Sequence, residues 1–437
     1  MRANRPRSTA AHEAITRRRH PASRNSSRVC RRYHPSMARC IILGAGPAGL
    51  AAACAFGESA VVIESGPSVA LRRREDPSEC VEGVGGAGLF SDGKFSYWPS
   101  ATQVWRLDPK YLEAAISWLS HQLSSAEIPE TLSTRREPAQ LVEGAFTQKS
   151  YPSFYASLSQ RRRLIDFLLD GIDVVTGTEV VGLSLSLKGP ANIVAQLSNG
   201  REIRANRLII ATGRFGSLQL SEGNLGKFLS PMRLEFGVRL EQPARDFFLR
   251  QDGRLDPKLI LRESGYECRT FCCCRNGEVI KTITRGITSV SGRADGARTD
   301  RSNVGFMCRT TDRTVLAHAT HLLIDCVRSQ SLPMVEELGA FLSGQPSLGL
   351  PPFGQHLTAR LSEGLRRLQS HYPALTDSGT TVHLPALEGV GWYPQTDEDL
   401  CVVPGHVWAA GDVVGRFRGI VAALISGYVA GTAAKEA

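Results

Sequence analysis

The chain has 437 residues, 42% of them hydrophobic, which is enough to bury a large core and to divide into more than one domain. The net charge of +10 comes almost wholly from residues 1–36, whose ten Arg and single acid, Glu13, give +9 and leave about +1 for the rest. A nearly neutral body argues against a basic nucleic-acid-binding surface. No apolar run is long enough to span a bilayer.

Residues 1–36 have no apolar segment of the kind that a secretory signal requires. Their Arg- and Ser-rich composition is typical of a transit peptide or of a disordered basic leader. A third interpretation, which we favour, is an over-extended reading frame, because Met37 opens a sequence that looks like a natural start. Eleven Cys at irregular spacings do not form a disulfide framework, so we expect a reducing, cytoplasmic setting.

Residues 38–66 show the order strand, glycine turn, helix, strand. The glycines give the pattern G-x-G-x-x-G, in which the first permits a tight turn, the second lets a pyrophosphate approach the backbone and the third lets the helix pack on the strand. The helix from Pro47 offers its N-terminal N–H groups to a phosphate, and Glu64 ends the next strand, where an acid binds ribose hydroxyls. The expected nucleotide contacts are Gly44, Ala45, Gly46, Pro47, Ala48, Gly49, Glu64 and Ser65.

The pair Gly411-Asp412 follows a short strand, and an apolar helix follows Gly419. In this arrangement the sequence resembles the FAD-dependent oxidoreductases of the glutathione-reductase-like superfamily. The resemblance implies that Asp412 binds the ribityl hydroxyls of FAD. It also implies that the start of the helix faces N1 and O2 of the flavin, where a positive helix terminus stabilises the anion of reduced flavin. The implied flavin contacts are Gly411, Asp412, Gly419, Ile420 and Val421.

A third segment, residues 173–216, matches the same superfamily. It contains a strand that begins at Val180, a hairpin, and a buried strand that ends in Ala211-Thr212-Gly213. The resemblance implies that Val180 contacts adenine and that Ala211, Thr212 and Gly213 lie at the cofactor. Three motifs in the order of the superfamily predict FAD as the cofactor.

The loop from Gly85 to Lys94 reads Gly-Gly-Ala-Gly-Leu-Phe-Ser-Asp-Gly-Lys. It is similar to a loop in a subgroup of bacterial FAD-dependent dehydrogenases of mostly unassigned substrate. Consecutive glycines expose backbone N–H groups to a phosphate or to the flavin ring, whereas the alternative is a flexible surface loop. The contacts that the resemblance implies are Gly86, Ala87, Gly88, Leu89, Ser91 and Lys94.

A second dinucleotide fingerprint, which disulfide reductases of the superfamily use for NAD(P)H, is absent from the sequence. Their redox Cys pair is absent too, because Cys54 and Cys80 lie too far apart to replace it. We therefore expect electrons to come from the substrate or from NAD(P)H that docks transiently, or to leave to an acceptor such as oxygen or a quinone.

Residues 267–279, ECRTFCCCRNGEV, concentrate four cysteines in one segment. Strand alternation predicts Cys268, Thr270, Cys272 and Cys274 on one face and Cys273 on the other. Asn-Gly at positions 276 and 277 predicts a hairpin in which the segment from residue 278 returns beside the cysteines.

The function of these cysteines has several interpretations. The segment resembles a Phe-Cys-x-Cys-Pro-Gly-Gly motif of the same subgroup, although Arg275 and Asn276 replace Pro and Gly. Small buried hydrophobes are the plainest alternative. A zinc site lacks its second knuckle, so we expect no metal, and a vicinal disulfide requires a strained ring. Cys272 and Cys274 are the candidates for a pair that faces substrate or flavin.

Between these motifs, residues 107–125 read as an amphipathic helix capped by Asp108, and residues 233–310 read as an antiparallel sheet. Residues 314–329 and 361–372 read as helices beside that sheet. His318 and His321 have helical spacing, but without a third ligand they are more typical of core or rim histidines than of a metal site.

The predicted fold class is α/β. It has a discontinuous Rossmann-like FAD-binding domain, residues 37–230 and 386–437, and an inserted α+β substrate domain, residues 231–385. The predicted function is an FAD-dependent oxidoreductase that transfers a hydride between flavin N5 and a small organic substrate. One alternative is a single-component flavin monooxygenase that uses NAD(P)H and oxygen, although its mid-chain Asp-Gly motif is not in place. The alternative from another class is a non-catalytic flavoprotein that binds a partner or nucleic acid; we expect a small-molecule substrate and no nucleic acid.

Overall fold

The computed structural model describes residues 38–132, 140–143, 145–186, 193–221, 225–316, 320, 324, 333–344, 353–376 and 379–437. The described residues from 38 to 437 group into one compact unit. The predicted leader, residues 1–36, lies outside the described residues. So do His318, His321 and most of the helix expected over 314–329.

A parallel sheet contains the strands that the sequence analysis places in the nucleotide-binding part. Its order is β20-β21-β11-β1-β2-β7, and every neighbouring pair is parallel except β20 and β21. Strands β1 and β2 each consist of four apolar residues that are all buried. Their sequences are continuously apolar because both faces of the sheet are covered. The bounds are β1 (Cys40–Leu43), β2 (Ala60–Ile63), β7 (Asp173–Val175), β11 (Arg207–Ile210), β20 (Cys401–Val403) and β21 (Val407–Ala409). This sheet and its helices confirm the α/β fold class.

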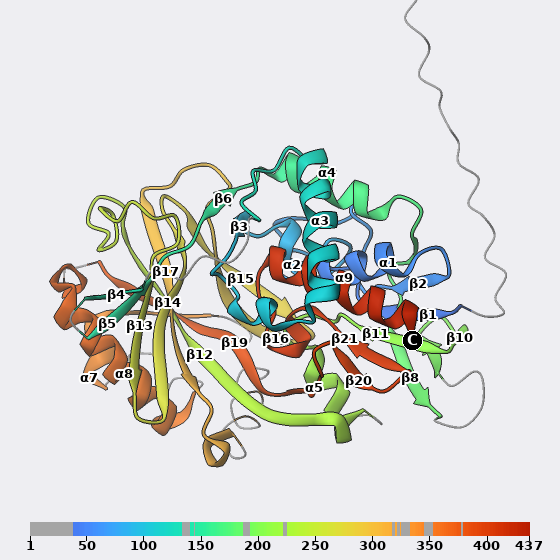
Figure 1. Cartoon of the computed structure of the whole chain (residues 1–437). Helices are drawn as coiled ribbons and strands as arrows, with labels where there is room; N and C mark the ends of the chain where they lie inside the picture. The colour runs from blue at the N-terminus through green and yellow to red at the C-terminus, as the bar shows by residue number, and fades with distance from the viewer. Residues whose placement is uncertain are drawn as a thin grey trace, which may run out of the picture. The chain divides into compact units, whose positions relative to one another are not determined.

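Helices α1 (Pro47–Phe56) and α9 (Ile420–Glu436) lie side by side against the parallel sheet (Figure 1). Their backbones approach so closely that a Cβ on Gly427 would collide with the carbonyl oxygen of Ala48, and one on Gly431 with that of Ala52. Both helices are apolar almost all round, as expected for helices that are buried on every side. The first and last predicted motifs are thereby brought together.

The smaller elements complete the nucleotide-binding part. Helix α3 begins as predicted, because Asp108 accepts a hydrogen bond from the backbone N–H of Lys110 at 2.8 Å. Helix α4 begins with a capping box between Ser157 and Gln160. The bounds are α2 (Gly86–Leu89), β3 (Lys94–Ser96), α3 (Pro109–Ser125), β6 (Ser153–Tyr155), α4 (Leu158–Leu169), β8 (Val180–Leu185), β9 (Ile193–Leu197), β10 (Glu202–Ala205) and α5 (Gly216–Ser221).

The predicted antiparallel sheet is confirmed, and we call it the large sheet. Its order is β18-β19-β12-β17-β14-β13-β5-β4. It recruits β4 and β5 from before residue 150, and β19 runs without a break through residues 385 and 386. The bounds are β4 (Gln140–Glu143), β5 (Phe146–Lys149), β12 (Leu229–Pro243), β13 (Lys258–Glu263), β14 (Tyr266–Cys274), β17 (Arg301–Thr310), β18 (Met334–Glu337) and β19 (Thr381–Pro394).

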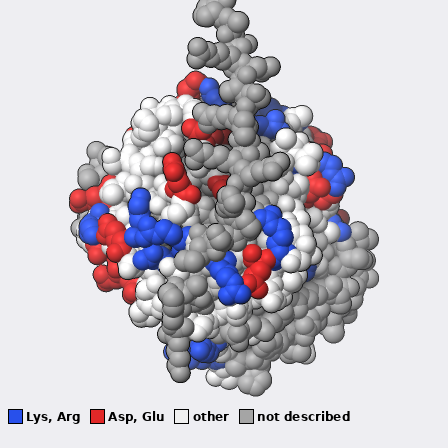
Figure 2. All heavy atoms as spheres, turned by 90° about the vertical axis from the view of Figure 1, so that its right-hand side faces the viewer, with Lys and Arg blue, Asp and Glu red and all other residues white. Residues whose placement is uncertain are grey.

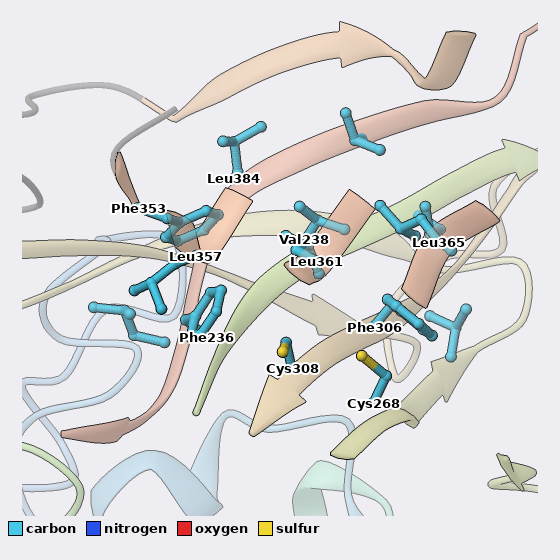
Figure 3. Packing of buried hydrophobic residues seen from close by; sticks show 14 of the residues in the cluster. Phe236, Val238, Cys268, Phe306, Cys308, Phe353, Leu357, Leu361, Leu365 and Leu384 are labelled. Atoms are coloured by element: carbon cyan, nitrogen blue, oxygen red, sulfur yellow. The ribbon is translucent and has the colours of Figure 1, made fainter. Parts of the chain in front are cut away.

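One face of the large sheet carries the main hydrophobic core. Helices α7 (Leu338–Ser343) and α8 (Gly354–His371) cover this face. Figure 3 shows Leu357, Leu361 and Leu365 of α8 directed toward Phe236 and Phe306 of the strands. Gly364 allows α8 to approach β14, because a Cβ there would come 2.5 Å from the sulfur of Cys268.

The hairpin predicted after the cysteines is wrong. Strand β15 (Glu278–Thr284) does not pair with β14 but with β16 (Ile287–Arg293), in a separate ribbon. The reason is that β13 and β17 already occupy both edges of β14. The Asn-Gly turn is formed, with Asn276 at φ 50°, but it leads the chain away from the large sheet.

Among the described helices, none combines the length and apolar character that crossing a bilayer requires. On the face presented in Figure 2, the described Lys and Arg side chains are interspersed with Asp and Glu.

Candidate functional site

The glycine turn after β1 has the geometry that its sequence predicts. Gly44 adopts φ +97°, and a Cβ there would come 2.6 Å from the carbonyl oxygen of Ala211. A Cβ on Gly49 would overlap the carbonyl oxygen of Gly44, so only glycine lets the helix pack on the strand. Helix α1 starts after Gly46 without a side-chain cap, which leaves its first-turn N–H groups available for a phosphate.

Glu64, the predicted ribose ligand, is buried beside this turn. One of its carboxylate oxygens accepts a hydrogen bond from the N–H of Ala45 at 2.8 Å, and the other accepts one from Gly66 at 2.8 Å. The carboxylate therefore holds the glycine turn against the end of β2. Since each carboxylate oxygen accepts about two hydrogen bonds, capacity for a ribose hydroxyl is left.

The glycine-rich loop from Gly85 lies directly on the first turn. The N–H of Gly85 donates to the carbonyl oxygen of Ala45 at 2.8 Å, and a Cβ on Gly86 would come 2.9 Å from the Cα of Gly46. On the other side, a Cβ on Gly88 would lie 3.3 Å from the side chain of Ile420. The first turn, this loop and the start of α9 thus meet at one place.

Arg72 holds this loop in position, a role that the sequence analysis missed. Its buried guanidinium donates to the carbonyl oxygens of Val84 at 2.8 Å and Gly86 at 3.0 Å, and it lies 4.7 Å above the ring of Phe90. Burial lowers the pKa of Arg72 to about 10, which still leaves it charged at neutral pH. Nothing in the run of three consecutive arginines distinguishes Arg72 from its neighbours.

The Gly411-Asp412 motif packs against the first turn of α1. Gly411 adopts φ +76°, its N–H donates to the hydroxyl of Ser426 at 3.0 Å, and a Cβ there would come 2.8 Å from the Cβ of Ala48. Gly419, at φ +98°, precedes α9, and no side chain caps that helix either. The N-termini of α1 and α9 are therefore both open next to the glycine turns.

Asp412 lies beside two arginines and keeps one oxygen unpaired. Its Oδ2 is 3.3 Å from Nε of Arg418 and 3.7 Å from Nε of Arg214. Burial acts to raise the pKa of Asp412, but Arg418 and Arg214 outweigh it, so the pKa lies below its usual value. Within the described residues, the buried Oδ1 of Asp412 and the buried Oγ1 of Thr212 have no hydrogen-bond partner. Such orphaned atoms fit the hydroxyls of a bound dinucleotide.

The remaining residues that were predicted to contact FAD differ in burial and in the groups that they contact. Ser65 and Val180 are half-buried, and Ala87 is exposed. Leu89 is buried in the core, where it lines a small apolar cavity with neighbouring side chains. The hydroxyl of Ser91 donates to the carbonyl oxygen of Gly88 at 3.0 Å, inside its own loop. The contacts of these residues with FAD stay predictions.

Lys94 links the loop to the cysteine strand. Its buried Nζ lies 2.8 Å from Oδ2 of Asp92 and 3.7 Å from Oδ1 of Asp256, and it donates to the carbonyl oxygen of Cys273 at 2.7 Å. Burial acts to lower the pKa of Lys94, but Asp92 and the other acids raise it well above its usual value. The ammonium is thus engaged within the protein, and its predicted cofactor contact would require one of these partners to be shared.

A β-bulge overturns the predicted alternation of the cysteines. Phe271 pairs with Gly305 and Cys274 with Asn303, so β14 contains one more residue than β17 over this stretch. Cys272 lies in the bulge and has a left-handed backbone conformation, with φ 50°. In consequence Cys274 lies on the face opposite to Cys268 and Thr270.

The bulge brings Cys272 and Cys274 to Asp92. Their sulfurs are 3.8 Å apart and lie 3.4 Å and 3.9 Å from Oδ2 of Asp92. The hydrogen bond with Cys274, together with burial, raises the pKa of Cys272 well above its usual value, so this thiol is protonated at neutral pH. Asp92 and the two sulfurs have the proximity of metal ligands, but Lys94 already neutralises the carboxylate. Cys268 and Cys273 belong to the main core instead.

The comparisons with known proteins identify no family. No family model and no curated protein match the sequence. Solved structures that resemble the chain include the Diels-Alderase PyrE3 of pyrroindomycin biosynthesis, at 14% identity and a TM-score of 0.38, with 86% of this chain and 59% of that chain covered. The halogenase PltM in complex with phloroglucinol and FAD shows 11% identity and a TM-score of 0.41, with 89% of this chain and 67% of that chain covered. A geranylgeranyl bacteriochlorophyll reductase-like protein from Thermoplasma acidophilum shows 12% identity and a TM-score of 0.42, with 92% of this chain and 78% of that chain covered.

The chain thus spans 59% of the length of the Diels-Alderase. At these identities and TM-scores, the likenesses define neither the family nor the reaction of this chain.

Proposed function

We propose that this protein binds FAD and is an FAD-dependent oxidoreductase that transfers a hydride between flavin N5 and a small organic substrate. The observation that carries the proposal is the meeting of three glycine turns, at Gly44, Gly86 and Gly411, around the uncapped N-termini of α1 and α9. These segments lie far apart in the chain, and a site for one extended dinucleotide explains why they converge.

The chemical character of the site supports a dinucleotide with a polar chain between its two ends. The start of α1 offers N–H groups for a pyrophosphate, and Glu64 lies where a ribose would reach it. Asp412 Oδ1 and Thr212 Oγ1 are buried acceptors or donors that need partners. Bound FAD supplies the hydride chemistry, while the protein binds and orients it and the positive end of α9 stabilises negative charge.

Two alternatives stay open to experiment. A flavin monooxygenase has the same single fingerprint and would use NAD(P)H, docking transiently, together with oxygen. A flavoprotein without catalytic activity would bind FAD and a macromolecular partner. Of the candidate catalytic residues, Cys272 and Cys274 lie beside Asp92, which belongs to the glycine-rich loop, and this placement favours a role close to the cofactor.

The test is an anaerobic visible spectrum of the purified full-length chain, before and after addition of NADH or NADPH. Flavin bands that bleach identify a reductase or a monooxygenase, and oxygen uptake then separates these two. Bands that persist with both nucleotides exclude a nicotinamide donor, and bleaching by an organic substrate then separates the proposed oxidoreductase from a flavoprotein without catalytic activity. A protein that shows no flavin bands and takes up no added FAD contradicts the proposal.

A further inference from the structure

The large sheet has a charged face opposite to its hydrophobic core. Residues of β12, β14 and β17 alternate, so that Phe236, Cys268 and Phe306 pack under α8 while their neighbours point the other way. Cross-strand pairing places Glu235 next to Arg309, and Arg309 next to Glu267. This second face carries Arg233, Glu235, Lys258, Glu267, Arg269 and Arg309, and we call it the charged face.

The charged face continues into the predicted flavin site. Glu235 lies 3.6 Å from Nη1 of Arg418. The same guanidinium nitrogen lies 2.6 Å from Oε2 of Glu388, and Nε of Arg418 lies 3.3 Å from Asp412. A single arginine therefore connects Asp412, the predicted ribityl contact, with Glu235 at the centre of the charged face.

More arginines surround Glu235 than a single carboxylate can neutralise. Arg309 Nη2 lies 2.9 Å from its Oε2, whereas Arg269 Nε is 3.4 Å from Oε1 and Arg233 Nη1 is 3.7 Å from Oε2. Burial alone would raise the pKa of Glu235, but Arg269, Arg233 and Arg418 together lower it to about 2. The carboxylate is thus surrounded by positive charge that it does not fully neutralise.

Several guanidinium donors on this face make no hydrogen bond to a described residue. Within the described part of the chain, the buried Nε and Nη2 atoms of both Arg233 and Arg269 make no hydrogen bond. Arg269 is only 8% exposed, and its nearest acid besides Glu235 is Glu267, whose Oε1 lies 3.1 Å from its Nη2. Arg269 therefore has ion-pair partners without hydrogen bonds, whereas Nε and Nη2 of Arg233 have neither among the described residues. Buried guanidinium donors without hydrogen bonds are costly, so this arrangement favours an anion.

The lysines beside Arg269 respond to the same positive charge. Burial and Arg269 lower the pKa of Lys258 to about 8. Burial and Arg269 also lower the pKa of Lys149, which pairs with Lys258 across β5 and β13. Cations with lowered pKa values around a carboxylate of lowered pKa indicate a local excess of positive charge.

We propose that the charged face binds the carboxylate of an organic substrate, with Arg233 and Arg269 as its principal donors and Lys258 as a further cation. This inference rests on the proposed function, which supplies the reaction for such a substrate. Two guanidinium groups suit a carboxylate because each presents paired donors in a fixed plane. A substrate anchored there lies on the side of the large sheet to which Arg418 and Asp412 are attached.

The binding test uses thermal unfolding of the full-length chain with a panel of carboxylates (acetate, benzoate, citrate and oleate) and with acetamide and benzamide as neutral analogues at equal ionic strength. At least one carboxylate should raise the midpoint by about 2–5 °C at saturation. The amides should leave it unchanged. A panel in which no carboxylate stabilises the protein overturns the inference.

Variants locate the site. Arg269→Met and Arg233→Lys should each weaken binding of the stabilising carboxylate by about 10-fold or more. Arg245→Met is the control, because Arg245 is largely exposed and pairs with Asp246 outside the charged face; it should bind like the wild type. If Arg233 and Arg269 were only structural, Arg269→Met would unfold at a lower temperature and Arg233→Lys would bind carboxylate normally, which contradicts the inference.

The flavin content of the same preparations separates the two hypotheses. Carboxylate binding by a protein that takes up no FAD leaves this inference standing and removes the proposed function. FAD binding without carboxylate binding does the reverse. Stabilisation by NADH or NADPH alone, lost in Arg269→Met, would assign the charged face to the phosphates of a nicotinamide nucleotide and overturn the assignment to an organic substrate.

Discussion

Arg418 bridges Asp412 and Glu388: its Nε lies 3.3 Å from Oδ2 of Asp412 and its Nη1 lies 2.6 Å from Oε2 of Glu388. Asp412 belongs to the motif that follows the parallel sheet, whereas Glu388 lies on β19 of the large sheet. Burial acts to lower the pKa of Arg418, but these acids raise it above its usual value, so the guanidinium is a permanent charge. Because Arg418 pairs with both acids, the position of Asp412, the predicted flavin contact, depends on Glu388 of the large sheet.

The first prediction concerns Asp412. Replacement Asp412→Asn keeps the shape of the side chain but removes the charge that holds Arg418 and replaces one of the two acceptor oxygens by an NH₂ donor. We expect at least about a 10-fold loss of FAD affinity, measured as the flavin-to-protein ratio after dialysis and by titration with FAD. Asp246→Asn, at an exposed pair with Arg245, is the control and should retain FAD. Equal retention in both variants would contradict the role of Asp412.

The second prediction concerns the contact of α1 with α9. Gly427→Ala places a methyl group against the carbonyl oxygen of Ala48, so we expect a loss of about 1–3 kcal/mol in the free energy of unfolding and weaker FAD retention. Gly339→Ala in α7 meets no atom within 4 Å and should be neutral or stabilising by up to about 1 kcal/mol. Denaturant unfolding compares the two, and similar effects at both sites would refute the close packing.

The third prediction concerns the ion pair of Asp92 and Lys94. Both side chains are buried, so Lys94→Met leaves a carboxylate without its cation and should cost about 3–5 kcal/mol. The double variant Asp92→Asn with Lys94→Met should recover much of that loss. Lys110→Met, at the exposed pair with Glu436, should leave the free energy of unfolding nearly unchanged. A small effect of Lys94→Met alone would show that the pair is not buried in solution.

The fourth prediction concerns pH. Lys258 releases its proton near pH 8 in the folded chain, against 10.5 for an ordinary lysine. Between these pH values the unfolded chain binds more protons than the folded chain, so the contribution of Lys258 makes the free energy of unfolding rise with pH. Measured by denaturant unfolding from pH 7 to 10.5, the free energy of unfolding of the wild type minus that of Lys258→Met should rise with pH. Identical profiles would mean that Lys258 has its ordinary pKa.

Much of the nucleotide-binding part could be predicted from the sequence because its determinants are local. The positive φ of Gly44, the start of α1 at Pro47 and the end of β2 before Glu64 all depend on residues within one short segment. The large sheet was predictable for a similar reason, since alternating apolar residues mark each of its central strands.

The features that sequence reasoning missed depend on residues that are distant in the chain. The bulge at Cys272 arises where β14 must match β17, and alternation within β14 alone does not reveal it. The hairpin prediction failed because both edges of β14 were already paired. The cluster of Arg233, Arg269 and Arg418 around Glu235 combines β12, β14 and the segment before α9, and no spacing in the sequence marks these arginines as neighbours.

The central claim is that the converging glycine turns bind FAD. The most direct measurement is the flavin content of the purified full-length chain, with the released cofactor identified by mass and the protein titrated with FAD by calorimetry. The account predicts FAD at about one molecule per chain, or uptake to that level on addition, with loss of binding in Gly46→Val. A chain that is folded, releases no FAD and binds none on titration would contradict the account.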